Sequence, residues 1–183
     1  MRKVYGVATN DVEGSTYTKA YRTWSSMLER CYSAKYQAKK PSYIGCTPSS
    51  EWLLFSNFKV WFDDNYIEGY QLDKDLFIDG NKIYSAATCF FVPPRLNSLF
   101  LDNKASRGCN MVGVSYDPDR RSKPYQDRIG KMRFPTELEA HASYISSKRQ
   151  LVLNELDKYE SEGIVDTRLI AAIRGRYYVE GNK

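Results

Sequence analysis

The sequence predicts an α+β protein built from two folded units in series, and three observations lead to that fold class. Before residue 62, apolar and aromatic residues recur at three- and four-residue spacing, the pattern of amphipathic helices. Residues 71–97 follow a strand, loop, strand and helix pattern. After residue 112, three short strand patterns precede a long helix pattern. We therefore expect one domain at residues 1–103 and a second at 104–183.

Two helices are expected ahead of the first strand. Between Thr18 and Tyr32 the apolar side chains share one helical face, and Trp24 is expected in the core. Thr47-Pro48 has the sequence of a helix cap followed by a first-turn proline, so a second helix is expected from there through Phe62. These helices would cover the small strand pair that follows, which is too small to bury itself.

Residues 71–97 hold the candidate chemistry of the first domain. Strands are expected around residues 72–78 and 89–92, with a turn at Gly80-Asn81 between them. Pro93-Pro94 can begin a helix. This order of elements can place a strand carboxylate and a helix amide on one divalent cation.

Several residues of this segment together resemble the ββα-metal core of phage HNH endonucleases. They are Asp73-Lys74-Asp75, Gly80-Asn81, Tyr84-Ser85, Thr88-Cys89 and a helical Asn97. Upstream, the pattern from Trp24 to Cys31 and that from Glu51 to Phe58 resemble the leader of the same phage proteins. The resemblance implies a DNA hydrolase in which Asp73 and Asn97 bind Mg²⁺ or Mn²⁺ and Asn81 orients the loop.

The sequence departs from the HNH pattern at Lys74, which stands where those enzymes carry the general-base His. Lys74 lies between two carboxylates, which favour its charged form, so it is expected to neutralise developing charge rather than to accept a proton. The one His of the chain, His141, lies far downstream. The resemblance thus leaves two functions open: a metal-dependent endonuclease, or a catalytically inactive HNH-derived DNA-binding regulator or anti-defence protein.

The second domain is expected to be a small three-stranded sheet followed by a helix. The strand patterns lie at residues 112–116, 125–129 and 131–134, after a polar linker between residues 101 and 110. Thr136 and Glu139 form the capping box of the helix. A final helix is expected over residues 167–179.

This half resembles an AP2-type DNA-binding domain through Gly113-Val114-Ser115-Tyr116, Tyr125-Gln-Asp-Arg128-Ile129 and Phe134-Pro-Thr136-Glu-Leu-Glu139-Ala140. The resemblance implies a sheet that lies in the major groove of double-stranded DNA, and it matches Arg128 to the family's strand arginine. The hairpin is shorter than in that family, which reduces the surface that could contact DNA bases.

The basic charge of the chain is concentrated in the same half. The net charge is +5, and residues 101–150 contribute +4 of it. This concentration of positive charge is suited to binding the phosphates of DNA. A solvated basic face, or a face that binds an acidic protein partner, would give the same pattern. The candidate DNA-binding residues are Tyr116, Arg120, Arg121, Lys123, Tyr125, Arg128, Lys131 and Arg133.

Composition excludes several other classes of protein. No apolar run reaches the length of a membrane span, and no apolar stretch follows the basic N-terminus, so we expect a cytoplasmic protein of a bacterial host cell. The cysteines include no CxxC pair, which disfavours zinc at Cys31, Cys46 and Cys89. No phosphate-binding glycine loop, GxSxG or HExxH motif is present.

Overall fold

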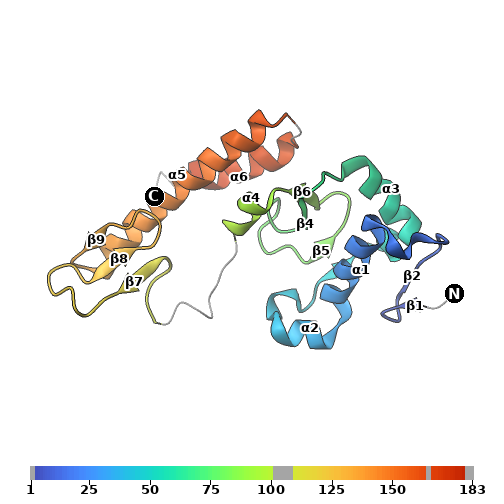
Figure 1. Cartoon of the computed structure of the whole chain (residues 1–183), viewed down its shortest axis with the longest axis horizontal. Coiled ribbons are helices and arrows are strands. Elements are labelled where there is room, and N and C mark those ends of the chain that lie inside the picture. The colour runs from blue at the N-terminus through green and yellow to red at the C-terminus, as the bar shows by residue number, and fades with distance from the viewer. Residues whose placement is uncertain (1–2, 101–108, 164–165, 180–183) are drawn as a thin grey trace. The chain divides into compact units, whose positions relative to one another are not determined.

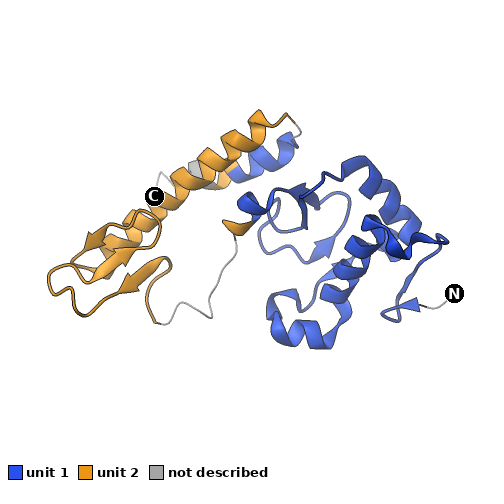
Figure 2. Cartoon of the chain, in the orientation of Figure 1, with its two compact units in different colours: residues 1–97, 166–173 blue, residues 98–165, 174–183 orange. Residues whose placement is uncertain are grey.

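The computed structural model describes residues 3–100, 109–163 and 166–179 (Figure 1). The fold is α+β, as predicted. The chain divides into two compact units, the first comprising residues 1–97 with 166–173 and the second residues 98–165 with 174–183 (Figure 2). The boundary expected at residues 103 and 104, and most of the expected linker, lie outside the described residues.

The first unit combines helices with pairs of short strands. β1 pairs with β2 and β4 with β6 in antiparallel register, whereas β3 and β5 pair in parallel. The strands are β1 (Lys3–Val4), β2 (Ala8–Thr9), β3 (Thr47–Pro48), β4 (Gln71–Asp73), β5 (Ile83–Tyr84) and β6 (Phe90–Val92). The helices are η1 (Ser15–Tyr17), α1 (Lys19–Tyr32), α2 (Ala34–Lys39), η2 (Pro41–Tyr43), η3 (Glu51–Leu53), α3 (Phe55–Asn65) and α4 (Pro94–Ser98), where η denotes a 3₁₀ helix.

Helix α1 forms where the apolar stripe predicted it. The Thr18 side chain accepts a hydrogen bond from the Tyr21 amide and so caps the first turn. The stripe is buried, and Trp24 has no exposed surface. The prediction of this helix and of its core tryptophan is confirmed.

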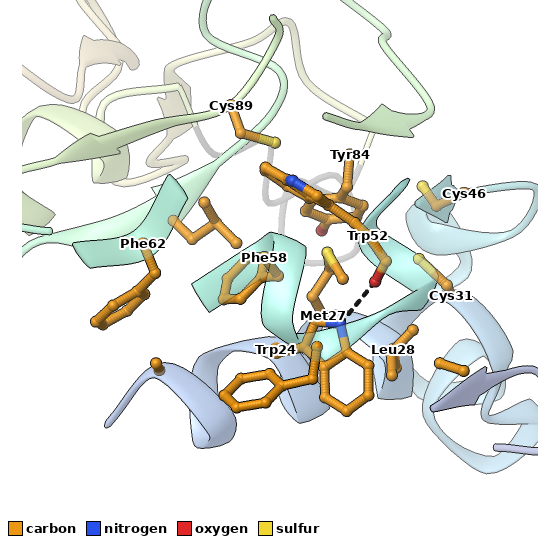
Figure 3. Close-up of a cluster of buried hydrophobic side chains, with 14 of the residues drawn as sticks. Trp24, Met27, Leu28, Cys31, Cys46, Trp52, Phe58, Phe62, Tyr84 and Cys89 are labelled. Atoms are coloured by element: carbon orange, nitrogen blue, oxygen red, sulfur yellow. Dashed lines mark hydrogen bonds between the residues drawn. The ribbon is translucent and has the colours of Figure 1, made fainter. Parts of the chain in front are cut away.

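The core of the first unit is largely aromatic (Figure 3). The Trp24 indole Nε1 donates a 2.7 Å hydrogen bond to the Trp52 carbonyl, so the burial of the ring leaves no donor unpaired. The Trp52 ring meets the Phe58 ring edge-on, with centroids 5.0 Å apart. The Trp61 and Phe91 rings are stacked at 5.4 Å, which joins helix α3 to strand β6. Helix α3 therefore covers the strand pair β4-β6, whereas α1 packs on α3 and on strand β3.

The prediction that the second helix starts at Thr47-Pro48 is wrong. These two residues form strand β3, because the Thr47 amide donates to the Lys82 carbonyl and the Ser49 amide to the Tyr84 carbonyl. Helix α3 begins at Phe55, after an extended Leu54. Its first turn is capped from a distance, since the Ser56 amide donates to the Asp11 carboxylate at 2.9 Å.

Strand β4 is also shorter than the strand pattern around residues 72–78. It ends at Asp73 because the Asp73 carboxylate accepts the amides of Asp75 and Leu76 and turns the chain. The second apolar run does form strand β6, and helix α4 starts at Pro94 directly after it. An antiparallel strand pair followed by a helix is thus present at residues 71–98.

The second unit contains a three-stranded antiparallel sheet in the order β7-β8-β9, packed against one long helix. Its elements are β7 (Val114–Tyr116), β8 (Tyr125–Asp127), β9 (Arg133–Phe134) and α5 (Glu137–Ser161). Thr136 and Glu139 form the predicted capping box at the start of α5. The strands are shorter than predicted, because Gly113 has φ +76° and the Asp127 side chain accepts the Ile129 amide.

Helix α6 (Thr167–Val179) forms over the predicted range. Its residues 166–173 group with the first unit, and its apolar stripe is buried through Leu169, Ile170 and Ile173. The Arg168 guanidinium lies 5.2 Å from the centroid of the Phe90 ring in strand β6. Within the described ranges, no helix combines the length and the apolar character needed to cross a membrane.

Candidate metal site and nucleic-acid interface

Asp73 ends strand β4 and holds the turn that follows with one carboxylate oxygen. Its Oδ1 accepts hydrogen bonds from the amides of Asp75 and Leu76, both at 2.7 Å. Its Oδ2 accepts no hydrogen bond from the described residues. A carboxylate has acceptor sites on both oxygens, so Asp73 retains a lone-pair face for a cation or for water.

The pKa of Asp73 is raised, chiefly because burial removes the carboxylate from water. The Asp75 carboxylate also raises it, whereas the two amide hydrogen bonds and the Lys74 ammonium act in the opposite direction. The ionised form therefore costs stability at neutral pH. A bound cation would offset that cost, because an opposite charge favours the ionised form.

Lys74 is 4% exposed and points into the first unit. Its Nζ donates to the Asp75 carboxylate and, at 2.6 Å, to the Asn81 carbonyl. The ammonium also lies 5.9 Å from the centroid of the Tyr43 ring and 5.6 Å from that of Tyr84. These contacts hold the loop between β4 and β5 on the core, and they do not present the ammonium to solvent.

Asn81 binds the same loop from the other end. Its Nδ2 donates to the Lys74 carbonyl at 2.9 Å and to the Ile83 carbonyl at 2.7 Å, and its Oδ1 accepts the Ile83 amide. The side chain of Lys74 binds the backbone of Asn81, and the side chain of Asn81 binds the backbone of Lys74. This reciprocal pair fixes the position of the turn around Gly80.

Asn97 lies on helix α4 and contacts strand β4 at its first residue. Its Nδ2 donates to Gln71 Oε1 at 3.1 Å, and no hydrogen bond joins it to Asp73. Among the described residues, no cluster of three or more His, Cys, Asp or Glu side chains could hold a metal. Asp73 and Asn97 offer a carboxylate and an amide oxygen on adjoining elements, which are ligand types that Mg²⁺ and Mn²⁺ take in proteins.

The three cysteines weighed for zinc are buried free thiols. Burial raises the pKa of Cys31 and of Cys89 to about 12, so both stay protonated at neutral pH, whereas zinc binds the thiolate. The Cys31 and Cys46 side chains lie in the same part of the core, while Cys89 lies on the other side of the Trp52 ring (Figure 3).

In the second unit, strand register decides which candidate residues face helix α5. Val114 pairs with Asp127 and both are buried against the helix, and Tyr116 and Tyr125 point to the same side of the sheet. The rings of Tyr116 and Tyr125 lie 5.1 Å apart, and Tyr116 is still half-exposed at the end of the hairpin. The two tyrosines are therefore not on the open face.

The open face of the sheet carries a row of polar side chains, Ser115, Gln126 and Arg133, one on each strand. Arg133 is held there by Asp117, whose carboxylate accepts from its guanidinium at 3.0 Å. Sequence reasoning missed Ser115, Gln126 and Asp117, although the period-two alternation from Val114 would have placed Ser115 on this face.

The remaining candidate cations lie at the two ends of the sheet. One group follows β7 and the other follows β8, and the intervening strand β8 has three residues, a span of about 10 Å. Asp127, which directly precedes Arg128, is fully buried, and it accepts from the Ser143 and Ser147 hydroxyls of α5. The first group is Arg120, Arg121 and Lys123, the second is Arg128 and Lys131, and all five are exposed.

Comparison with known proteins assigns the chain to no group, because no family model, no characterised protein and no solved structure matches it.

Proposed function

We propose that this protein binds double-stranded DNA through the sheet of its second unit and belongs to the phage HNH homing-endonuclease class. The observation that carries the proposal is the set of exposed cations at both ends of an open polar sheet face. The two groups are separated by about 10 Å or more, and the major groove is about 12 Å wide. The cations would contact the phosphates on both rims of the groove.

In this arrangement the row on the open face meets the edges of the bases. Arg133 would donate to guanine and Gln126 to adenine, the pairings that these side chains form best. The Asp117 carboxylate would keep the guanidinium of Arg133 in place, since it already accepts from it. The AP2-like order of strands and helix supports the same use of the sheet.

Binding should be strongly salt-dependent, because five exposed cations would release counterions from the DNA. Five phosphate contacts predict a loss of affinity of about 500-fold between roughly 50 and 200 mM salt. The test is fluorescence anisotropy with a labelled duplex, comparing wild type with the triple variant Arg120→Gln, Arg121→Gln, Lys123→Gln. The variant should lose about three units from the slope of log affinity against log salt.

A matched control removes the same charge from the first unit. Lys3→Gln, Lys19→Gln and Lys59→Gln alter three lysines whose contacts are with surface partners of that unit. This variant should keep the wild-type slope. Equal effects of the two triple variants, or a shallow slope in wild type, would refute the sheet as the DNA site and favour an acidic protein partner.

We further propose that Asp73, with Asn97, binds Mg²⁺ or Mn²⁺ for DNA nicking. The ion would polarise a phosphate and acidify a water. Asp73 would supply the carboxylate, with its Oδ1 kept in place by the two turn amides. Lys74 and Asn81 would hold the loop rather than take part in proton transfer.

A catalytically silent DNA-binding regulator is the second candidate function. It is favoured by the position of Lys74, which is buried and hydrogen-bonded where HNH enzymes carry their base. His141 belongs to the second unit, where its Nδ1 lies 2.8 Å from the Val112 carbonyl, and not to the unit that holds Asp73.

Supercoiled plasmid distinguishes the two candidates. Wild type and Asp73→Asn are incubated with it in Mg²⁺, in Mn²⁺ and in EDTA. The asparagine keeps an oxygen for the two turn amides, so the variant should fold and still shift DNA. Metal-dependent nicking that is lost in Asp73→Asn supports the nuclease. Gel shifts without nicking in either metal support the regulator.

A further inference from the structure

The first unit contains a basic surface that its own acids do not neutralise. From Arg30 to Ser50 the sequence has four basic residues and no Asp or Glu. Lys35, Lys39 and Lys40 are exposed on and after helix α2. Within the described ranges, none of these three lysines has a carboxylate within ion-pair distance. We call Arg30 together with these three lysines the α2 surface.

Arg30 differs from two other arginines that have a buried nitrogen without a hydrogen-bond partner. Such an atom occurs in Arg30, Arg133 and Arg174. Arg133 pairs with Asp117, and Arg174 pairs with Asp157 and Glu160. Arg30 forms no ion pair with a described residue. A partly buried guanidinium without a carboxylate is an unusual cost to the fold, which an external anion would offset.

Aromatic rings hold the guanidinium of Arg30 in place. Its carbon lies 5.7 Å from the centroid of the Tyr43 ring, and Tyr43 in turn packs edge-on against Tyr36 of α2. The Tyr84 hydroxyl accepts one of its hydrogen bonds. Lys74 lies over the same Tyr43 ring and pairs with the Asp75 carboxylate.

We propose that the α2 surface is a second phosphate-binding site, at which the first unit contacts the DNA backbone independently of the sheet. The fork of Arg30, fixed by Tyr43 and Tyr84, binds one phosphate, because a guanidinium matches phosphate geometry with two parallel donors. Lys35, Lys39 and Lys40 contact neighbouring phosphates as mobile point charges. This inference rests on the proposed DNA-binding function and adds a site in the other unit.

The experiment measures the salt dependence of duplex binding for full-length variants. Arg30→Gln should reduce the slope of log affinity against log salt by about one unit, and Lys35→Gln, Lys39→Gln, Lys40→Gln by up to about three. The Lys3, Lys19 and Lys59 triple variant carries the same charge change and should leave the slope unchanged. The α2 lysines are exposed, so their triple variant remains informative if Arg30→Gln unfolds.

A second readout tests the site without DNA. Thermal unfolding followed by tryptophan fluorescence is measured in inorganic phosphate and in chloride at equal ionic strength. Phosphate should raise the midpoint of wild type and of the control variant, but not that of Arg30→Lys, which keeps the charge and loses the fork. The three tryptophans lie at residues 24, 52 and 61, so the signal reports the first unit.

The outcomes separate this inference from the proposed function. In one outcome, the Arg120, Arg121, Lys123 triple variant has a reduced salt dependence of DNA affinity, both α2 variants keep the wild-type salt dependence, and phosphate has no Arg30-dependent effect. The sheet function then stands and the inference is overturned. If wild type binds no DNA but phosphate stabilises it through Arg30, the anion site stands and the DNA function is wrong. Loss of slope in the α2 variants, with the control unchanged, supports both.

Discussion

Replacing Asp127 with alanine should destabilise the second unit and leave the first unit unaffected. The carboxylate is fully buried and accepts the Ile129 amide at 2.7 Å and the hydroxyls of Ser143 and Ser147 at 2.9 and 3.1 Å. It therefore connects the turn after β8 to helix α5. A buried donor left without a partner costs about 1–3 kcal/mol, and the hydroxyls can rotate toward other acceptors. We expect a total loss of about 3 kcal/mol.

The two units can be monitored separately in one urea titration. Every tryptophan of the chain lies in the first unit, whereas much of the helical signal comes from α5, a helix of 25 residues. For Asp127→Ala the circular-dichroism transition of the second unit should move down by about 2 M urea. The tryptophan transition should stay where it is. Asp119→Ala, which removes an exposed carboxylate from the same unit, is the control.

Lowering the pH of wild-type protein tests the same contribution, because it protonates the Asp127 carboxylate. Burial raises the pKa of Asp127, but the hydrogen bonds from Ile129, Ser143, Gly130 and Ser147 outweigh it, and the net shift is downward. A lowered pKa means that this stabilisation is fully present above about pH 4 and is lost as the pH falls through the folded-state value. A circular-dichroism shift under about 0.5 M for Asp127→Ala, or an equal shift of the tryptophan transition, would refute the reasoning.

Three further predictions concern single features of the fold. Asp73→Asn should raise the tryptophan-monitored stability at pH 7, because the raised pKa of Asp73 makes its ionised form costly. The gain should shrink as the pH falls through the raised folded-state pKa and disappear below the pKa of the unfolded chain, about 4. Gly113→Ala should destabilise the second unit by about 3 kcal/mol in a urea titration, because Gly113 has φ +76° and a Cβ there would lie 2.1 Å from the Tyr144 ring. In a constant excess of Mg²⁺, a zinc-selective chelator should not change the melting temperature of the first unit, since burial raises the pKa of Cys31 to about 12 and keeps its thiol protonated; a chelator-dependent shift would restore the zinc alternative.

Helices that depend on local chemistry were predictable from the sequence. The capping box at Thr136 and Glu139 and the stripe around Trp24 both act within a few residues, so each helix start was placed correctly. Thr47-Pro48 shows the limit of local reasoning. Its strand partner, β5, lies more than 30 residues away, and no local signal distinguishes that pairing from a helix cap.

The candidate sites show the same limit. The spacing of Asp73, Lys74 and Asn81 predicted that they would share a loop, but not that Lys74 would be buried between two tyrosine rings. Likewise, Asp127 counts against the basic residues in a sequence window, yet the register pairs it with buried Val114 and turns it toward the helix. A charge count cannot predict the side of a sheet to which a side chain points. That side depends on where each strand begins and ends, which single residues such as Gly113 determine.

Helix α6 has a consequence for the order in which the chain folds during synthesis. Its residues 166–173 belong to the first unit, where Leu169, Ile170 and Ile173 are buried, although everything else in that unit precedes residue 98 (Figure 2). While a ribosome makes the second unit, the first still lacks part of its apolar contacts. Domains usually fold as units in order of synthesis, but here the first unit is complete only after residues 98–165 of the second unit have been made. A nascent chain that has not yet reached residue 168 therefore lacks the guanidinium that lies over the Phe90 ring.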